Sequence, residues 1–425
     1  MDDGAIDFKR SAREAAYAMP LADINPADAE LFQNDTMWPY FERLRKEDPV
    51  HWSVSPEPEI GGYWSVTKYN DIMAVDTNHL DFSSEPAIVL PDPEADFTLP
   101  MFIAMDQPKH DVQRKTVSPA VAPPNLALLE PVIRERAAAI LDELPIGEQF
   151  DWVDKVSIEL TTMTLATLFD FPWEDRRKLT RWSDVATAGP NSGLFSSNDP
   201  EIAKQEGRAE LFECVDYFMR LWNERVNAPP KGDLISMLAH GESTRNMDRM
   251  EYLGNLILLI VGGNDTTRNS ITGSILALSQ NPDQEALLRA DHSLIPAMVS
   301  ETIRWQTPLA YMRRTALRDV ELGGKTIKKG DKLAMWYVSG NRDEEVIDRP
   351  NDYWIQRPRV RQHLSFGFGI HRCVGNRLAE LQLKIIWEEI LARFPKIDVV
   401  GPPRRVPSPF VKGYEYLPVI IPTRN

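Results

Sequence analysis

Cysteine is scarce in this chain, and long apolar runs are absent. Only Cys214 and Cys373 occur among 425 residues, too few for a disulfide scaffold or for the four thiolates of a typical iron–sulfur cluster. The most apolar long stretch, residues 253–261, falls far short of the roughly 20 residues that cross a bilayer. The N-terminus lacks the apolar segment of a secretory signal. We therefore expect a cytoplasmic protein with no membrane anchor.

Basic charge is also in short supply. The chain has 48 Lys and Arg against 63 Asp and Glu, a net charge of −15. Such a surface is poorly suited to nucleic acid, whose phosphates demand basic patches. The seven histidines show no zinc spacing such as H-E-x-x-H. The hydrophobic content of 43% is ample for a large core.

The pattern of residues predicts a mainly α protein with a minor β region. Helical periodicity dominates from about residue 109 to 305 and returns at 376–394. Strands are expected at about 50–82 and 314–338, without βαβ alternation. Residues 1–35 are expected to form a loose lead-in. The Pro-rich but apolar segment 84–108 is a predicted ligand lid.

A Gly-rich loop just before the last predicted helix carries the strongest signal. Its sequence is Phe366-Gly367-Phe368-Gly369-Ile370-His371-Arg372-Cys373-Val374-Gly375. The glycines permit tight turns and close approach to a flat ligand, and a cysteine before a helix start is favoured as thiolate. The alternative is an ordinary buried cysteine, which the complete ten-residue pattern outweighs.

Two further segments lie on predicted helices. Glu301 and Arg304 are three residues apart and share one helix face. Gly262-Gly263 interrupts the long helix predicted at 250–280, at a cost of roughly 1 kcal/mol per Gly relative to Ala. Asp265 and Thr266 follow, an acid and an alcohol that suit proton delivery. The alternative for Thr266 is a hydroxyl that bonds to the preceding turn and bends the helix.

Together these three segments resemble the haem-binding loop, the E-x-x-R pair and the oxygen-activation segment of the cytochrome P-450 superfamily, in the same order. The resemblance covers essentially the whole chain. It implies the cytochrome P-450 fold with a long central helix, as a single domain over residues 1–425. It further implies haem b as cofactor, Cys373 as the axial ligand of the iron, and Asp265 and Thr266 as catalytic residues. It also implies a structural role for Glu301 and Arg304, with Arg342 or Arg357 as a third partner.

The resemblance also implies which residues bind the haem. Four of them match positions that hold the haem propionates: His110, Arg114, Arg314 and His363. The loop adds Phe366, Gly367, His371, Cys373 and Gly375. Arg313, adjacent to Arg314, leaves open which arginine points inward.

The implied reaction is insertion of one O2 atom into an unactivated C–H bond of an apolar small molecule. The wording of the motifs resembles a bacterial branch of terminal hydroxylases of medium-chain alkanes and fatty acids. Candidate walls of a substrate channel are Leu99, Met101, Phe102, Ile103, Val261, Gly262, Leu309, Tyr311 and Phe410. The alternatives are a hydroxylase of a bulky terpenoid or steroid, and a non-catalytic haem-thiolate sensor or carrier.

No flavin or iron–sulfur motif is present, so electrons must come from outside the chain. A small ferredoxin with an NAD(P)H-dependent ferredoxin reductase is implied. From Tyr353 to Ala379 there are five arginines and no Asp or Glu. This run has two interpretations of equal weight: loop arginines that satisfy carbonyls and propionates, or a docking patch for an acidic electron donor.

Overall fold

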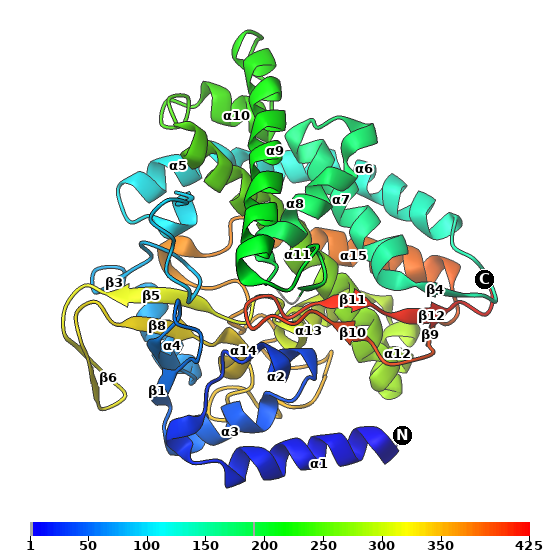
Figure 1. The fold of residues 1–425 in the computed structure, drawn as a ribbon. Helices are drawn as coiled ribbons and strands as arrows, with labels where there is room; N and C mark the ends of the chain where they lie inside the picture. Colours follow the sequence, from blue (N-terminus) through cyan, green and yellow to red (C-terminus); the bar gives the residue numbers. More distant parts are fainter. Residues whose placement is uncertain (1–2, 190–191) are drawn as a thin grey trace.

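The 32-residue helix α11 (Arg249–Gln280) runs through the middle of the molecule, and other helices surround it (Figure 1). The Asp248 side chain begins the helix by accepting bonds from the N–H groups of Met250 and Glu251. Asn281-Pro282 ends it. Helices α7, α8, α9, α13 and α15 all contact α11. The central helix expected at 250–280 is therefore confirmed, and so is a mainly α fold with a minor β region.

The computed structural model describes residues 3–189 and 192–425. Its helices are α1 (Asp3–Ala18), α2 (Ala29–Gln33), α3 (Trp38–Glu47), α4 (Tyr69–Thr77), α5 (Lys109–Val117), α6 (Pro123–Asp142), α7 (Glu159–Phe169), α8 (Arg177–Thr187), α9 (Pro200–Val226), α10 (Leu234–His240), α11, α12 (Pro282–Ala290), α13 (Ile295–Gln306), α14 (Tyr337–Gly340) and α15 (Asn376–Arg393). Across the described residues, no helix combines the length and the apolarity that a membrane crossing needs.

The strands form a mixed five-stranded sheet, in the order β1-β2-β8-β5-β3, and three smaller sheets. In the larger sheet β2 and β8 pair in parallel, and the other neighbouring strands described there pair antiparallel. The strands are β1 (Val50–Val54), β2 (Gly62–Val66), β3 (Phe82–Ser83), β4 (Gln149–Asp151), β5 (Met312–Ala316), β6 (Val320–Leu322), β7 (Lys325–Ile327), β8 (Lys332–Met335), β9 (Asp398–Val399), β10 (Arg404–Arg405), β11 (Tyr414–Tyr416) and β12 (Pro418–Ile420). Strand β4 and the C-terminal strands are too short for their alternation to mark them in the sequence.

The expectation of a loose lead-in at residues 1–35 is wrong. Helix α1 packs against α3, where Ala16 is buried with Tyr40 and Leu44. An ion pair of 2.6 Å between Arg13 and Glu42 joins the same two helices.

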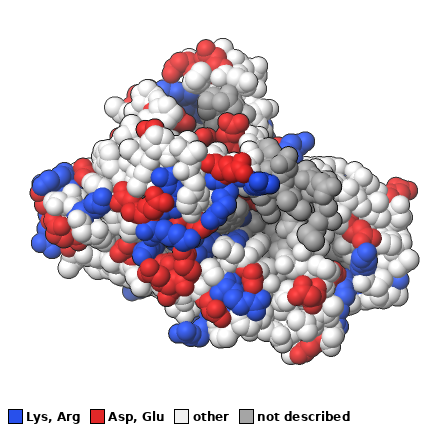
Figure 2. Space-filling view, turned by 90° about the horizontal axis from the view of Figure 1, so that it is seen from below, with Lys and Arg blue, Asp and Glu red and all other residues white. Residues whose placement is uncertain are grey.

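The face of the molecule seen from below in Figure 2 mixes acidic and basic side chains, so the net negative charge does not form a field of one sign there.

The predicted lid, residues 84–108, is irregular except for a short 3-10 turn at Phe102–Ala104 and the isolated bridge between Glu94 and Phe97. It is bound to the central helix: the Phe102 N–H donates to Asn255 Oδ1 at 3.0 Å. A Cβ on Gly254 would lie 2.1 Å from the Pro100 carbonyl oxygen. The lid backbone therefore lies directly on α11, and Gly254 makes that approach possible.

A buried ion-pair triad ties the end of α13 to the irregular segment that follows α14. Glu301 pairs with Arg304 at 2.7 Å and with Arg357 at 3.0 Å. The two guanidinium groups donate their remaining N–H groups to carbonyl oxygens of residues 341, 348–350 and 352. Arg357 is thus the third partner. Arg342 lies between the rings of Trp38 and Trp305, 4.3 and 3.7 Å from their centroids.

We expect Arg357→Met to lower the free energy of unfolding of the haem-loaded protein by about 3–5 kcal/mol, because it leaves a buried carboxylate short of a partner. Arg304 and Arg357 hold the pKa of Glu301 below its ordinary value, so this stabilisation is present above the unfolded pKa and is lost as the pH falls through the folded one. Urea denaturation at neutral and acid pH measures both effects.

The matched control is Arg361→Met, which breaks an ion pair with Glu380 in which the Arg361 side chain is 73% exposed. It should cost less than about 1 kcal/mol. Equal losses in the two variants would contradict a dominant role for the triad.

Candidate active site

The Gly-rich loop presents Cys373 at the start of helix α15. The Cys373 N–H donates to the Phe366 carbonyl oxygen at 2.8 Å, which closes the loop. The backbone N–H groups of Gly375 and Asn376 donate hydrogen bonds to the sulfur, which oppose the rise that burial causes in the pKa of the thiol. This arrangement favours a thiolate at the positive end of the helix dipole.

Two glycines of this loop have backbone conformations that other residues rarely adopt, since φ is +62° at Gly367 and +67° at Gly369. A Cβ on Gly369 would lie 2.6 Å from the backbone oxygen of Asp76 in α4. The loop therefore rests directly on the end of that helix.

The Cys373 residue is exposed to solvent, but many protein atoms lie around its sulfur. Burial is the largest influence on its thiol and raises the pKa, against the lowering effects of Gly375, Arg114 and Arg372. Arg114, from α5, also donates a hydrogen bond to the Arg372 carbonyl oxygen. Cations thus lie beside the sulfur, and a metal cation is the partner that would complete its ionisation.

Two buried imidazoles lie beside the loop with unpartnered nitrogens. The rings of His110 and His371 are 4.1 Å apart. His371 lacks a hydrogen-bond partner on both ring nitrogens, and His110 lacks one on Nε2. Burial lowers the pKa of His110, and burial with the Arg314 charge lowers that of His371 to about 2. Buried polar groups normally have hydrogen-bond partners. These nitrogens are therefore suited to bind a polar group of a ligand.

Of the two adjacent arginines, Arg314 lies on the side of His371. Arg314 makes a buried ion pair of 2.8 Å with Asp76. Arg313 instead pairs at 2.7 Å with Asp92 of the lid, a residue whose side chain is 57% exposed.

His363 lies apart from this group. Its ring is buried with Nδ1 unpartnered, and burial with the charge of Arg304 lowers its pKa to about 3. The charges with the largest effect on it are those of Arg304 and Glu301, followed by Arg361 and Arg372. The structure thus brings together three of the four predicted propionate ligands and separates the fourth.

The middle of α11 has open space on one side. Gly262 is exposed, and an added Cβ would meet nothing within 4 Å. Val261 and Thr266 are half-buried on a helix that is otherwise largely enclosed. The Thr266 hydroxyl donates to the Gly262 carbonyl oxygen at 3.0 Å, the bond to the preceding turn that was the alternative for this residue.

Asp265 points toward helix α8. Its carboxylate accepts from the hydroxyls of Ser183 at 2.8 Å and Thr187 at 3.3 Å, and pairs with Arg268 at 3.2 Å. Arg268 pairs in turn with Asp184 at 2.6 Å. Burial raises the pKa of Asp265, against the opposing charge of Arg268. The acid predicted to be catalytic therefore belongs to a network between α8 and α11 that the sequence motif does not reveal.

The predicted substrate residues have different surroundings. Six of them are half-buried: Leu99, Met101, Ile103, Val261, Leu309 and Phe410. Phe102 is buried in the main core. Tyr311 is buried in a second cluster with Trp336, and its hydroxyl oxygen accepts a hydrogen bond from the Leu90 N–H at 3.0 Å. The position of Tyr311 favours a packing role.

These features fit a haem. A thiol at a helix N-terminus would supply an iron ligand, and the unpartnered imidazoles and arginines would supply donors for two propionates. Helix α11 has open space at Gly262. The sequence did not predict a role for Asp76 or for the network of Ser183, Thr187 and Asp184. They carry no motif, and only the fold brings them to the site.

Comparison with known proteins agrees with this fit. A family model described as Cytochrome P450 matches residues 193–409. The chain is 36% identical over 405 residues to Linalool 8-monooxygenase of Pseudomonas putida, covering 92% of this chain and 97% of that one. It is 34% identical to Steroid C26-monooxygenase of Mycolicibacterium smegmatis, covering 88% of each.

Among solved structures, CYP153D17 from a Sphingomonas species is 49% identical, with a TM-score of 0.85 over 93% of this chain and 98% of that one. The relatives match nearly the full chain, and members of their family hold haem through a cysteine thiolate. The chain therefore belongs to the cytochrome P450 family of haem-thiolate monooxygenases.

Proposed function

We propose that this monooxygenase hydroxylates the terminal methyl group of a linear, uncharged hydrocarbon chain of medium length. The observation that carries the proposal is which carbon atom two relatives oxidise. Carbon 8 of linalool and carbon 26 of a steroid side chain are both chain-end carbons, and both stand in the names of relatives that match nearly the whole chain. The motif wording resembles the terminal hydroxylase branch.

Cys373 would hold the haem iron, with His110, His371, Arg114 and Arg314 around the propionates. The bound haem supplies the site where O2 is activated and its O–O bond is cleaved. The overall balance is one C–H bond, one O2, two electrons and two protons in, and one alcohol and one water out. The protein must therefore deliver two protons and keep bulk water from the reacting carbon.

Thr266 and the α8–α11 network suit proton delivery. Because the Thr266 proton is bonded to the Gly262 carbonyl, the lone pairs of the hydroxyl are available to accept a hydrogen bond and hold a water that carries the proton. Asp184, with its side chain 27% exposed, connects through Arg268 to buried Asp265. This connection leads from the surface to the residue next to Thr266.

We expect Thr266→Ala to leave haem loading and substrate binding nearly unchanged, while most NADH-derived electrons end in hydrogen peroxide rather than product. The reason is that the variant lacks the Thr266 hydroxyl, which accepts a hydrogen bond from the group that delivers the proton. The ratio of product formed to NADH consumed, with hydrogen peroxide assayed in parallel, measures this coupling.

Thr267→Ala is the matched control, since Thr267 is adjacent but buried. Coupling that is unchanged in Thr266→Ala, or lost equally in both variants, would reduce Thr266 to a helix-bending residue.

The charge of the lid favours an uncharged substrate over a fatty acid. Residues 84–108 contain five acids and neither Lys nor Arg. On α9, Arg208 is paired with Glu94 at 2.8 Å and Asp96 at 2.9 Å, and Lys204 is paired with Glu94. A substrate carboxylate near the lid would meet acids and cations that are already neutralised.

Incubation of the reconstituted enzyme with octane, dodecanoic acid, linalool and a steroid tests the substrate and the position of attack. We expect mostly terminal alcohol from octane and weaker turnover of the acid. A terminal methyl has the strongest C–H bonds of an alkane, so only a narrow channel that restricts reach selects it. Mass spectrometry of the products gives the position. Mostly subterminal alcohols, or turnover of the steroid alone, would favour the bulky-substrate alternative.

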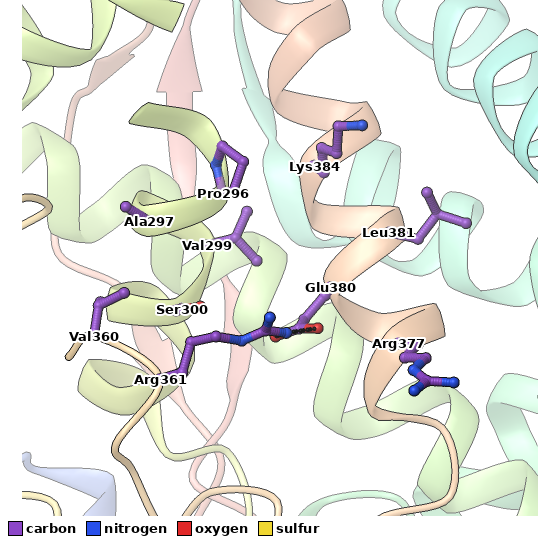
Figure 3. A pocket seen from close by; sticks show the side chains of 10 residues that line it. All are labelled: Pro296, Ala297, Val299, Ser300, Val360, Arg361, Arg377, Glu380, Leu381 and Lys384. Atoms are coloured by element: carbon purple, nitrogen blue, oxygen red, sulfur yellow. Dashed lines mark hydrogen bonds and ion pairs between the residues drawn. The ribbon is translucent and has the colours of Figure 1, made fainter. Parts of the chain in front are cut away.

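We further propose that an acidic ferredoxin, reduced by an NAD(P)H-dependent reductase, docks beside α13 and α15. A shallow pocket of about 360 Å³ lies there, with apolar walls from Val299, Val360 and Leu381 (Figure 3). Arg377, near Cys373 in sequence, lines the same pocket. Arg361 also lines it, but its pairing with Glu380 at 2.6 Å neutralises part of the positive run.

We expect Arg377→Glu to slow the first electron transfer from an acidic ferredoxin, with the larger effect at low salt, because it reverses charge in the docking patch. Stopped-flow reduction of the haem at several ionic strengths measures the rate. Arg220→Glu on α9 changes the net charge equally at an exposed position away from this pocket, and should leave the rate unaltered. Equal effects of the two variants would contradict docking at this pocket.

A further inference from the structure

Asp76 is a buried acid that no sequence motif marks. It lies at the end of α4 and is 4% exposed. An ionised carboxylate at such a depth is costly unless donors surround it. Its contacts therefore show what holds it in place and what it holds in turn.

Three donors from three separate elements converge on the Asp76 carboxylate. Arg314 of β5 donates to Oδ1 at 2.8 Å. The Tyr337 hydroxyl of α14 donates to Oδ2 at 3.1 Å, and the backbone N–H of Phe368 donates to the same oxygen at 2.8 Å. A carboxylate accepts all three bonds at once, so Asp76 joins the cysteine loop to the arginine beside it.

The backbone of the loop is fitted to the same residue. Besides the close approach of Gly369 to the Asp76 backbone oxygen, a Cβ on Gly367 would lie 3.3 Å from Asp76 Oδ2. Phe368, between these glycines, is five residues before Cys373. A change in the Asp76 side chain therefore reaches the loop that presents the sulfur.

We propose that Asp76 is a positioning residue for the haem, which fixes Arg314 and the cysteine loop and whose negative charge lowers the reduction potential of the iron. The first part follows from the three hydrogen bonds. The second follows from Coulomb's law in a poorly screened interior, where a nearby anion favours the more positively charged, oxidised iron. The proposal requires the haem of this family but does not depend on the substrate or the redox partner.

The test compares haem-loaded Asp76→Asn with the wild type. Asn keeps the size of the side chain and loses its charge, so we expect a more positive reduction potential and a several-fold faster loss of haem to an excess of apomyoglobin. Since burial raises the pKa of Asp76, both measurements are made at alkaline pH, where the wild-type carboxylate is ionised. Unchanged potential together with unchanged haem loss would overturn the proposal.

Asp92→Asn is the matched control, because it removes the acid partner of the neighbouring Arg313 at an exposed position. It should change neither quantity, and a shift equal to that of Asp76→Asn would overturn the specific role. If Asp76→Asn does not fold with haem, Asp76→Glu keeps the charge and displaces the hydrogen bonds. We then expect faster haem loss than in Asp92→Asn, and an equal rate would overturn the proposal.

Discussion

The neutralisation of Glu301 inside the protein is the interaction on which the rest of the structure depends. An isolated carboxylate there would be prohibitively costly, and two arginines meet it with good geometry. The same arginines bind carbonyl oxygens of an irregular segment that follows α14. One buried charge thus gives order to a long stretch without regular structure, and that stretch leads into the cysteine loop.

The site divides into two parts that the core connects. On one part, the loop lies against α4 and presents its sulfur to the start of α15. On the other, α11 provides open space at Gly262 and a hydroxyl at Thr266. The loop and α11 are each anchored by buried polar contacts, the loop through Asp76 and the helix through Asp265, so Cys373 and Thr266 are each held by a packed scaffold.

The sequence predicted those features of the site that local chemistry determines. The periodicity of residues 250–280 matched α11 almost to the residue, and the Gly-rich pattern located Cys373. Features that depend on distant partners could not be read in the same way. His363 stands within the motif region, yet the fold places it beside the triad. Tyr311 looked like a channel wall, but Trp336 and the Leu90 N–H enclose it. Asp76 and Ser183 gave no signal, because only folding brings them to the loop and to Asp265.

The contact at Gly254 has a consequence for how this enzyme can diversify. Any side chain at that position would displace the lid backbone at Pro100. Substitutions of Gly254 are therefore not tolerated as long as the lid keeps its path. The half-buried lid residues Leu99 and Met101 carry no such restriction. Side-chain exchange at Leu99 and Met101 should therefore be tolerated over a fixed lid backbone, and directed evolution of this segment would gain most from libraries at these two positions.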